Sequence, residues 1–149
     1  MSLDLKPALR SALLDVPAIV ALLAQWKGEG AVFTRRPVPD DAPLPLAVIS
    51  KPTALNDEDG LSSDRPVATH QIAFYGRKGR PGSTEDHTRE VEEAAFLARQ
   101  HFHRNRFSVV PTGYSVIDVH VRGPVDAPVD DDNMVGAVVV LTVRLRRQT

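Results

Sequence analysis

The sequence predicts a single small domain of the α+β class, and three observations lead to this prediction. The chain has 149 residues, of which 42% are hydrophobic and 25% are charged, as in a soluble domain that can bury a core. Two helical patterns come first, and strand-like segments then surround one longer helical pattern. Two long alternating segments close the chain. We therefore expect two short N-terminal helices, a mostly antiparallel sheet of about four or five strands, one central amphipathic helix packed on it and a long C-terminal β-hairpin, in one domain over residues 1–149.

The N-terminal region predicts a pair of helices. Apolar residues recur at helical spacing through residues 5–13, and Asp4 can cap the helix that they form. The sequence Asp15-Val16-Pro17 predicts a stop and a restart, because Asp caps well and Pro suits a first turn. Apolar residues from 19 to 26 then predict a second short helix that runs to Gly28.

Three strands are expected in the first half of the chain, at residues 31–34, 46–50 and 67–75. Four prolines between 37 and 45 keep the chain extended but unsuited to the centre of a sheet. The polar residues 56–64 carry turn chemistry and predict a solvated loop.

The central helix begins at a Ser83–Asp86 pair that resembles a capping box and runs to about Phe102. Its apolar stripe is mostly alanine, so the helix can lie close against a sheet. Phe96 projects roughly opposite this stripe, beside Arg99 and His103. A large aromatic residue there is either exposed or covered by another surface.

Alternating segments at residues 114–121 and 135–145 predict the C-terminal hairpin. The first half of the second segment is apolar on both sides, which favours a central strand covered by helices. The connection at residues 123–133 is too long for a tight turn and too polar to bury.

The sequence contains no pattern that nominates catalysis or a bound cofactor. It has no cysteine, which excludes disulfides, thiolate metal sites and cysteine nucleophiles. The five histidines lack ligand spacing, and the aspartates between 126 and 132 lack the calcium-loop pattern. No phosphate-binding loop, nucleophile elbow or HExxH helix is present. We therefore expect no enzymatic activity, no cofactor and no metal.

Charge and hydropathy limit the expected partners. The formal net charge is -1, so no global field attracts nucleic acid, and we expect no sequence-specific nucleic-acid binding. The basic clusters at residues 77–80 and 144–147 are either solubilising ends or docking sites for an acidic protein surface. No signal-peptide pattern or apolar run of membrane-spanning length is present, so we expect synthesis in the cytoplasm and no membrane contact.

Four segments form an ordered layout. They are the paired helices around the Asp-x-Pro break (residues 8–17), the Gly-then-strand passage (28–33), the Pro-rich approach to a strand (42–50), and the charged helix that precedes the C-terminal hairpin. In this order they resemble the phage tail-completion (tail-terminator) family, which phage-like gene transfer agents share. The resemblance covers almost the whole chain and makes residues 1–149 a tail-completion-like domain.

The resemblance implies a ring, commonly a hexamer, at the head-proximal end of a tail tube. Such a ring stops tube growth and docks the head connector or stopper protein, and no catalysis or cofactor is expected of it. Two other functions stay open: another head–tail neck or tail-tube protein, or a generic protein-binding module. An enzyme would instead require a concave pocket with converging polar groups.

Three surfaces and one turn are the candidate contacts with other protomers or with the tube. They are the Phe96 face, the loop at residues 56–65, the loop at residues 123–133 and the basic turn. The individual candidate residues are Phe96, Arg99, His103, Asp57, Asp59, Arg65, Asp130, Asp131, Arg77 and Lys78.

Overall fold

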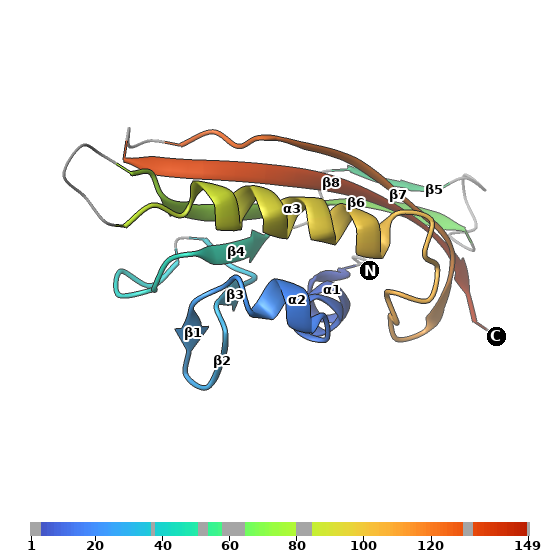
Figure 1. Cartoon of the computed structure of the whole chain (residues 1–149). Coiled ribbons are helices and arrows are strands. Elements are labelled where there is room, and N and C mark those ends of the chain that lie inside the picture. Colours follow the sequence, from blue (N-terminus) through green and yellow to red (C-terminus); the bar gives the residue numbers. More distant parts are fainter. Residues whose placement is uncertain are drawn as a thin grey trace.

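One mixed sheet forms the body of the protein, with the helices on one of its faces (Figure 1). The computed structural model describes residues 4–36, 38–50, 54–57, 65–79, 85–129 and 133–148. In chain order the elements are α1 (Lys6–Leu14), α2 (Pro17–Val20), β1 (Gln25–Trp26), β2 (Glu29–Gly30), β3 (Val32–Phe33), β4 (Leu46–Ile49), β5 (Ala54–Asp57), β6 (Pro66–Arg77), α3 (Thr88–Phe102), β7 (Tyr114–Asp126) and β8 (Met134–Arg147).

The sheet has the strand order β3-β4-β6-β8-β7. Strand β5 pairs with the first four residues of β6, before the residues that pair with β4. Every pairing is antiparallel except that of β3 with β4. The long strand β8 lies between β6 and β7, as the two-sided apolar pattern of its first half predicts. The α+β class, the mostly antiparallel sheet and the long C-terminal hairpin are therefore confirmed.

The N-terminal helices form as expected, but the second is shorter than predicted. The Asp4 carboxylate accepts a hydrogen bond of 2.9 Å from the backbone N–H of Lys6, the first residue of α1. Helix α2 ends at Val20 rather than running to Gly28. Lys27 and Gly28 both have positive φ, so this pair makes a tight turn between β1 and β2. Trp26 consequently lies in a strand, where its ring packs edge-on against Phe33 at 5.9 Å.

Helix α3 packs close to the sheet through its small residues. Ala94, Ala95 and Ala98 are buried, as the alanine stripe predicts. At the start of the helix, a Cβ on Gly76 of β6 would lie 2.5 Å from the Cβ of His87, so glycine is needed there.

The start of α3 differs from the prediction. The helix begins at Thr88, and Ser83 lies outside the described residues. Asp86 accepts the backbone N–H and the hydroxyl of Thr88, at 3.1 and 2.7 Å, and the backbone N–H of Gly79 at 3.1 Å. The Thr88 bonds and the Gly79 bond hold the pKa of the Asp86 carboxyl below its usual value. Asp86 thus orders the turn before the helix instead of closing a capping box.

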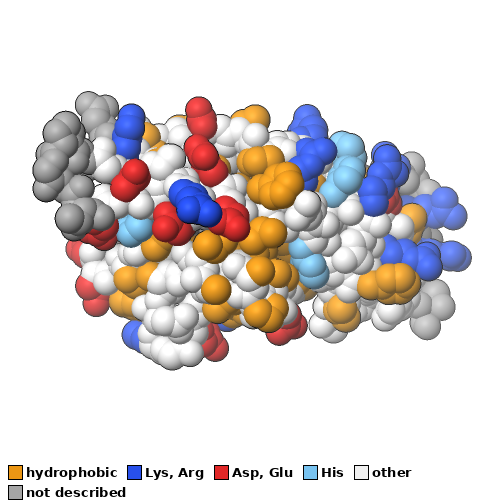
Figure 2. Space-filling view, viewed as in Figure 1, with side chains coloured by type: hydrophobic (Ala, Val, Ile, Leu, Met, Phe, Trp, Pro, Cys, Tyr) orange, Lys and Arg blue, Asp and Glu red, His pale blue; other side chains and the backbone are white. Residues whose placement is uncertain are grey.

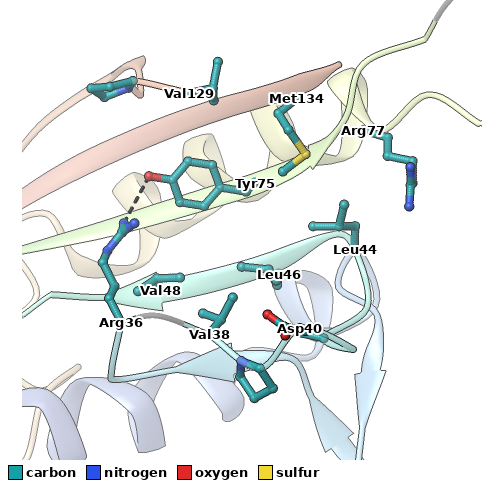
Figure 3. Close-up of a pocket in the computed structure, with 13 residues that line it drawn as sticks. Arg36, Val38, Asp40, Leu44, Leu46, Val48, Tyr75, Arg77, Val129 and Met134 are labelled. Atoms are coloured by element: carbon teal, nitrogen blue, oxygen red, sulfur yellow. Dashed lines mark hydrogen bonds between the residues drawn. The ribbon is translucent and has the colours of Figure 1, made fainter. Parts of the chain in front are cut away.

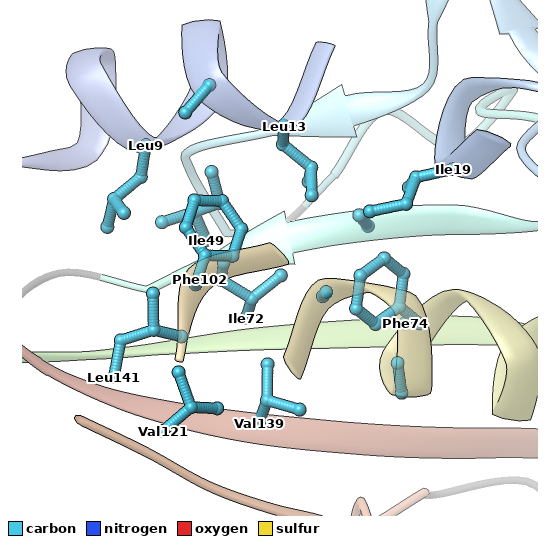
Figure 4. Close-up of a cluster of buried hydrophobic side chains, with 14 of the residues drawn as sticks. Leu9, Leu13, Ile19, Ile49, Ile72, Phe74, Phe102, Val121, Val139 and Leu141 are labelled. Atoms are coloured by element: carbon cyan, nitrogen blue, oxygen red, sulfur yellow. The ribbon is translucent and has the colours of Figure 1, made fainter. Parts of the chain in front are cut away.

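The main core lies between α3, the N-terminal helices and the inner face of the sheet (Figure 4). Its largest fully buried side chains include Leu9, Leu13, Ile19, Ile49, Ile72, Phe74, Phe102, Leu141 and Leu145. The alternating residues of β8 from Ala137 to Leu145 point into this core, as predicted.

The outer face of β8 is not covered by a helix, which corrects the expectation of helices on both sides. Figure 1 shows the three helices on the same side of the sheet. On the other side, Tyr75 packs with Ala73, Ala127 and Val138 in a small separate cluster. A Cβ on Gly136 would lie 2.9 Å from two atoms of the Tyr75 ring, so the ring lies directly over this glycine. Tyr75 and Ala127, rather than a helix, therefore cover Gly136 and Val138 on this face of β8.

Two predicted loops are partly strand. Asn56 and Asp57 lie in β5, opposite Val67 and Pro66, because pairing with β6 overrides their low strand propensity. Strand β7 continues to Asp126 through an irregularity between Arg122 and Val125. An edge strand tolerates a proline at such a bulge, so Gly123-Pro124 does not end it.

Among the helices that the structure describes, none has both the length and the apolar character needed to cross a bilayer.

Candidate assembly surfaces

The Phe96 face lies on the side of α3 that faces solvent. The side chain of Phe96 is 50% exposed, while its helix neighbour Ala95 is fully buried. The helical periodicity therefore places Phe96 correctly. Its proposed contact with another protomer stays a prediction.

Arg99 and His103 both bind the edge strand β7 of their own chain. The Nη1 of Arg99 donates to the carbonyl of Gly123, and the Nδ1 of His103 accepts the backbone N–H of Val121 at 3.0 Å. The backbone N–H of Arg104 donates to the carbonyl of Val119 at 2.8 Å. Three backbone groups on the free edge of β7 therefore have hydrogen-bond partners at the end of α3: the carbonyls of Val119 and Gly123 and the N–H of Val121.

This capping limits how β7 can pair with another chain. A free edge strand presents a row of unpaired donors and acceptors to which a second strand can add. Strand addition at Val119–Gly123 would require the three bonds from α3 to break. On the opposite edge, the Nε of Arg10 donates to the carbonyl of Val32 in β3 at 3.2 Å. Side chains from the helical layer therefore reach both edges of the sheet.

Two histidines meet at the capped edge. The rings of His103 and His120 lie 5.1 Å apart in an edge-on arrangement. Partial desolvation lowers the pKa of His103, and the nearby Arg99 and His120 lower it further, while Asp118 opposes them. A neutral His103 can accept the Val121 N–H, whereas a protonated ring cannot.

His70 lies elsewhere, on the inner face of β6, and does not meet His120. It is fully buried, and its Nδ1 lies 2.9 Å from the carbonyl oxygen of Ser50. Its Nε2 has no hydrogen-bond partner among the described residues. Burial is the largest of the effects that lower its pKa. The described part of the chain contains no group of three or more potential metal ligands.

The remaining predicted contact residues are dispersed. Arg77 lies 3.4 Å from the Glu85 carboxylate, and the backbone N–H of Lys78 donates to the carbonyl of Asn133 at 2.7 Å. Asp57 is the last residue of β5, and Arg65 is exposed just before β6. Asp59, Asp130 and Asp131 lie outside the described residues.

A groove of about 760 Å³ lies on the outer face of the sheet (Figure 3). Its floor is formed by Leu46 and Val48 of β4 and by the ring of Tyr75, which the strand register places on one face. Val38, Ala42 and Leu44 from the Pro-rich segment form one wall, and Val129 and Met134 the other. The Arg36 guanidinium donates to the Tyr75 hydroxyl at 3.1 Å, with Asp40 nearby on the rim.

The other end of the sheet carries an exposed apolar loop. Phe107 and Val110 are 77% and 81% exposed, and they line a cleft of about 700 Å³ against α1. Between them, Val109 is buried, and Asn105 accepts the backbone N–H of Phe107 and of Ser108 at 3.3 and 3.1 Å. The loop is therefore held in place while its two largest apolar side chains face solvent.

Positive charge gathers at the same end as this loop. Figure 2 shows most of the Lys and Arg side chains of this face near the C-terminus, whereas the Asp and Glu side chains lie mainly over the rest of the face. The exposed arginines of this end are Arg104, Arg106, Arg144, Arg146 and Arg147. This face is thus polarised along the direction of the long strands.

Neither the groove nor the apolar loop was predicted from the sequence. One signal was available for the groove: Gly136 interrupts a strand of β-branched residues, which indicates that another group approaches closely. The exposure of Phe107 and Val110 had no comparable signal, because they lie in an irregular segment without periodicity.

These features define the class of the domain: a mostly antiparallel, mixed sheet with one amphipathic helix and an N-terminal helical pair on a single face. No protein-family model matches the chain, and a search of curated proteins gives no match. Among solved structures, the chain is similar to one from the "Virion of native gene transfer agent (GTA) particle". The TM-score is 0.71 and the identity is 14%, with 96% of this chain and 95% of that chain covered. The two chains share a fold over nearly their whole lengths.

Proposed function

We propose that the chain is a structural subunit of a phage or phage-like tail, where it caps the tail tube as a hexameric ring and joins the tube to the head connector. One observation carries the proposal: a chain of a gene transfer agent virion has the same fold, with a TM-score of 0.71 over 96% of this chain. The resemblance of the segment order to tail-completion proteins supports a place at the end of the tail. After synthesis in the cytoplasm, the subunit is incorporated into the particle.

The distribution of exposed apolar side chains supports self-assembly. Phe96 on α3, and Phe107 and Val110 on the loop between α3 and β7, are each at least half exposed. A closed ring needs a heterologous interface, in which two different patches of each subunit meet those of its neighbours. The groove and the apolar loop are two such patches on one chain.

The partners in this proposal are further copies of the chain, the tail-tube protein and the head connector or stopper protein. The proposal includes no enzymatic activity, no cofactor and no sequence-specific nucleic acid. The arginine-rich end suits an acidic surface on one of the protein partners.

Deletion of the gene in the organism that makes the particles tests this function. We expect unattached heads together with tails of irregular length, because nothing stops the tube or joins it to the connector. Supplying the wild-type chain from a plasmid should restore intact particles. Intact particles in the deletion strain would contradict the proposal.

The alternative functions give different results in the same experiment. Loss of a tube subunit would remove tails altogether, whereas loss of a connector stopper would leave tails of normal length beside heads that leak DNA. A generic binding module outside the particle would leave particle morphology unchanged.

A further inference from the structure

The end of α3 is held against the edge of β7 by three hydrogen bonds at alternate residues. They use the carbonyl of Val119, the N–H of Val121 and the carbonyl of Gly123. The middle bond differs from the other two, because its acceptor is the Nδ1 of His103. The donors of the outer bonds are an arginine guanidinium and a backbone N–H, which do not change charge between about pH 5 and 8. The middle bond is therefore the pH-sensitive one of the three.

The geometry fixes the protonation state of His103. The backbone N–H of Val121 can only donate, so the Nδ1 that lies 3.0 Å from it must carry a lone pair. The neutral ring with its proton on Nε2 meets this requirement. A second proton on the ring goes to Nδ1, where it would face the Val121 N–H donor to donor. Protonation of His103 thus removes this hydrogen bond and replaces it with a repulsion.

The groups around His103 make its charged form unfavourable in the closed arrangement. Arg99 and Arg104 flank the ring in its own segment, and the ring of His120 approaches from β7, with the ring centres 5.1 Å apart. Partial desolvation lowers the pKa of His103, and these three neighbours lower it further, while the Asp118 carboxylate of β7 opposes them. A protonated His103 would add a positive charge between two arginines. This repulsion favours movement of the helix end away from β7.

The backbone next to His103 is strained as well. Arg104 has a φ of 60°, in the left-handed region that residues other than glycine rarely adopt. Its N–H donates to the carbonyl of Val119 at 2.8 Å, and this bond helps to hold the conformation. The Arg104 side chain is 69% exposed, so its ion pair with Asp118 at 3.8 Å adds little. Release of the His103 bond would let Arg104 relax, and the Val119 bond would then weaken too.

We propose that His103 is an acid-sensitive latch, whose protonation detaches the end of α3 from the middle of the β7 edge. At neutral pH the latch is closed, and the edge is protected from the addition of another strand. In acid the latch opens, and the N–H and carbonyl groups of residues 119–121 become accessible to water or to a strand of another chain. The inference concerns the domain itself, so it does not depend on the proposed place in a tail.

Amide hydrogen exchange followed by NMR between pH 7.5 and 5.0 tests the latch. Protection factors, which correct for the pH dependence of intrinsic exchange, are compared for Val121 and for Ile72, a buried residue paired with β4 and β8. Ile72 reports on unfolding of the whole domain, so a fall confined to Val121 is local. We expect the protection factor of Val121 to fall about fivefold or more in acid relative to that of Ile72, as for loss of one hydrogen bond. The fall should have the same midpoint as the protonation of the His103 ring.

His103→Asn is the matched variant. The side-chain oxygen of Asn reaches about the position of the histidine Nδ1 and can accept the Val121 N–H, but it takes up no proton in this pH range. The Val121 protection factor of this variant should therefore stay constant from pH 7.5 to 5.0. His101→Asn is the control, because no hydrogen bond from the His101 ring to β7 is found among the described residues. It should keep the pH dependence of the wild type.

Two results would overturn the latch. One is a Val121 protection factor that stays constant while the His103 ring takes up its proton, and the other is an equal fall in wild type and His103→Asn. If the Asn side chain does not protect Val121 at pH 7.5, the two midpoints in the wild type decide the question. A common midpoint for ring protonation and for loss of protection supports the latch, and separate midpoints reject it.

Discussion

The backbone N–H of Val121 donates to the Nδ1 of His103 at 3.0 Å, so a histidine at the end of α3 closes the middle of the edge strand β7. Arg99 and Arg104 satisfy the groups two residues to either side. The edge strand is therefore protected by its own helix. Two side chains expected to contact other protomers also have this intramolecular role.

Removal of the His103 ring should expose this part of β7. His103→Leu eliminates the acceptor, so the Val121 amide should exchange with solvent faster, as measured by hydrogen–deuterium exchange in NMR spectra. His101→Leu is the control, because no hydrogen bond of the His101 ring to β7 is found among the described residues. Equal protection of Val121 in wild type and His103→Leu would contradict the capping role.

Acid should weaken the fold through His70. Its pKa is lowered in the folded chain, so the unfolded chain binds a proton more readily. Stability is then fully present above the unfolded pKa of about 6.5 and falls as the pH drops toward the lower folded pKa. Urea denaturation at pH 7.5 and 5.5 should show this loss, and the loss should be smaller in His70→Leu. An identical pH dependence in the two proteins would contradict this role of His70.

A side chain at position 136 should displace the Tyr75 ring. Gly136→Val places its Cβ about where the Tyr75 ring carbons approach to 2.9 Å and the Ala127 Cβ to 3.0 Å. We expect a loss of about 1–3 kcal/mol in the free energy of unfolding, as for an overpacked site. Combining it with Tyr75→Ala should recover part of the loss in a double-mutant cycle. Additive effects of the two substitutions would show that the ring and the glycine are not coupled.

A charge at position 96 should weaken assembly while the fold stays intact. Phe96 is half exposed, so Phe96→Asp changes few core contacts. If the Phe96 face contacts a neighbour, its loss should weaken association by at least about fivefold, corresponding to roughly 1 kcal/mol. Light scattering gives the oligomer mass, and thermal unfolding reports on the fold. An unchanged mass with unchanged thermal stability would remove Phe96 from the interface.

Periodicity allowed much of the fold to be predicted, because it is a local property of the chain. The alanine stripe of α3, the exposure of Phe96 and the alternation of β8 all follow from residue spacing. The end of α2 could not be predicted in this way, because the apolar spacing continues to Trp26 while the helix ends at Val20. The chain instead turns at Lys27 and Gly28, whose φ angles are positive. The limits of β5 and β7 depend on pairing partners far along the sequence.

The candidate surfaces were harder to predict than the elements. The bonds of Arg99 and His103 to β7 depend on how the end of α3 meets an edge strand, which residue spacing does not encode. The groove combines residues of β4, β6 and β8 with the Pro-rich segment, so it exists only once the sheet has formed. Contacts between residues so far apart in the sequence cannot be predicted from residue spacing.

Localisation of the chain within the particle tests the central claim most directly. Electron microscopy of particles that carry a tagged copy of this chain should show one ring of label at the head-proximal end of the tail tube. Label along the whole tube, or particles without label, would contradict the proposed place of this protein at the end of the tail.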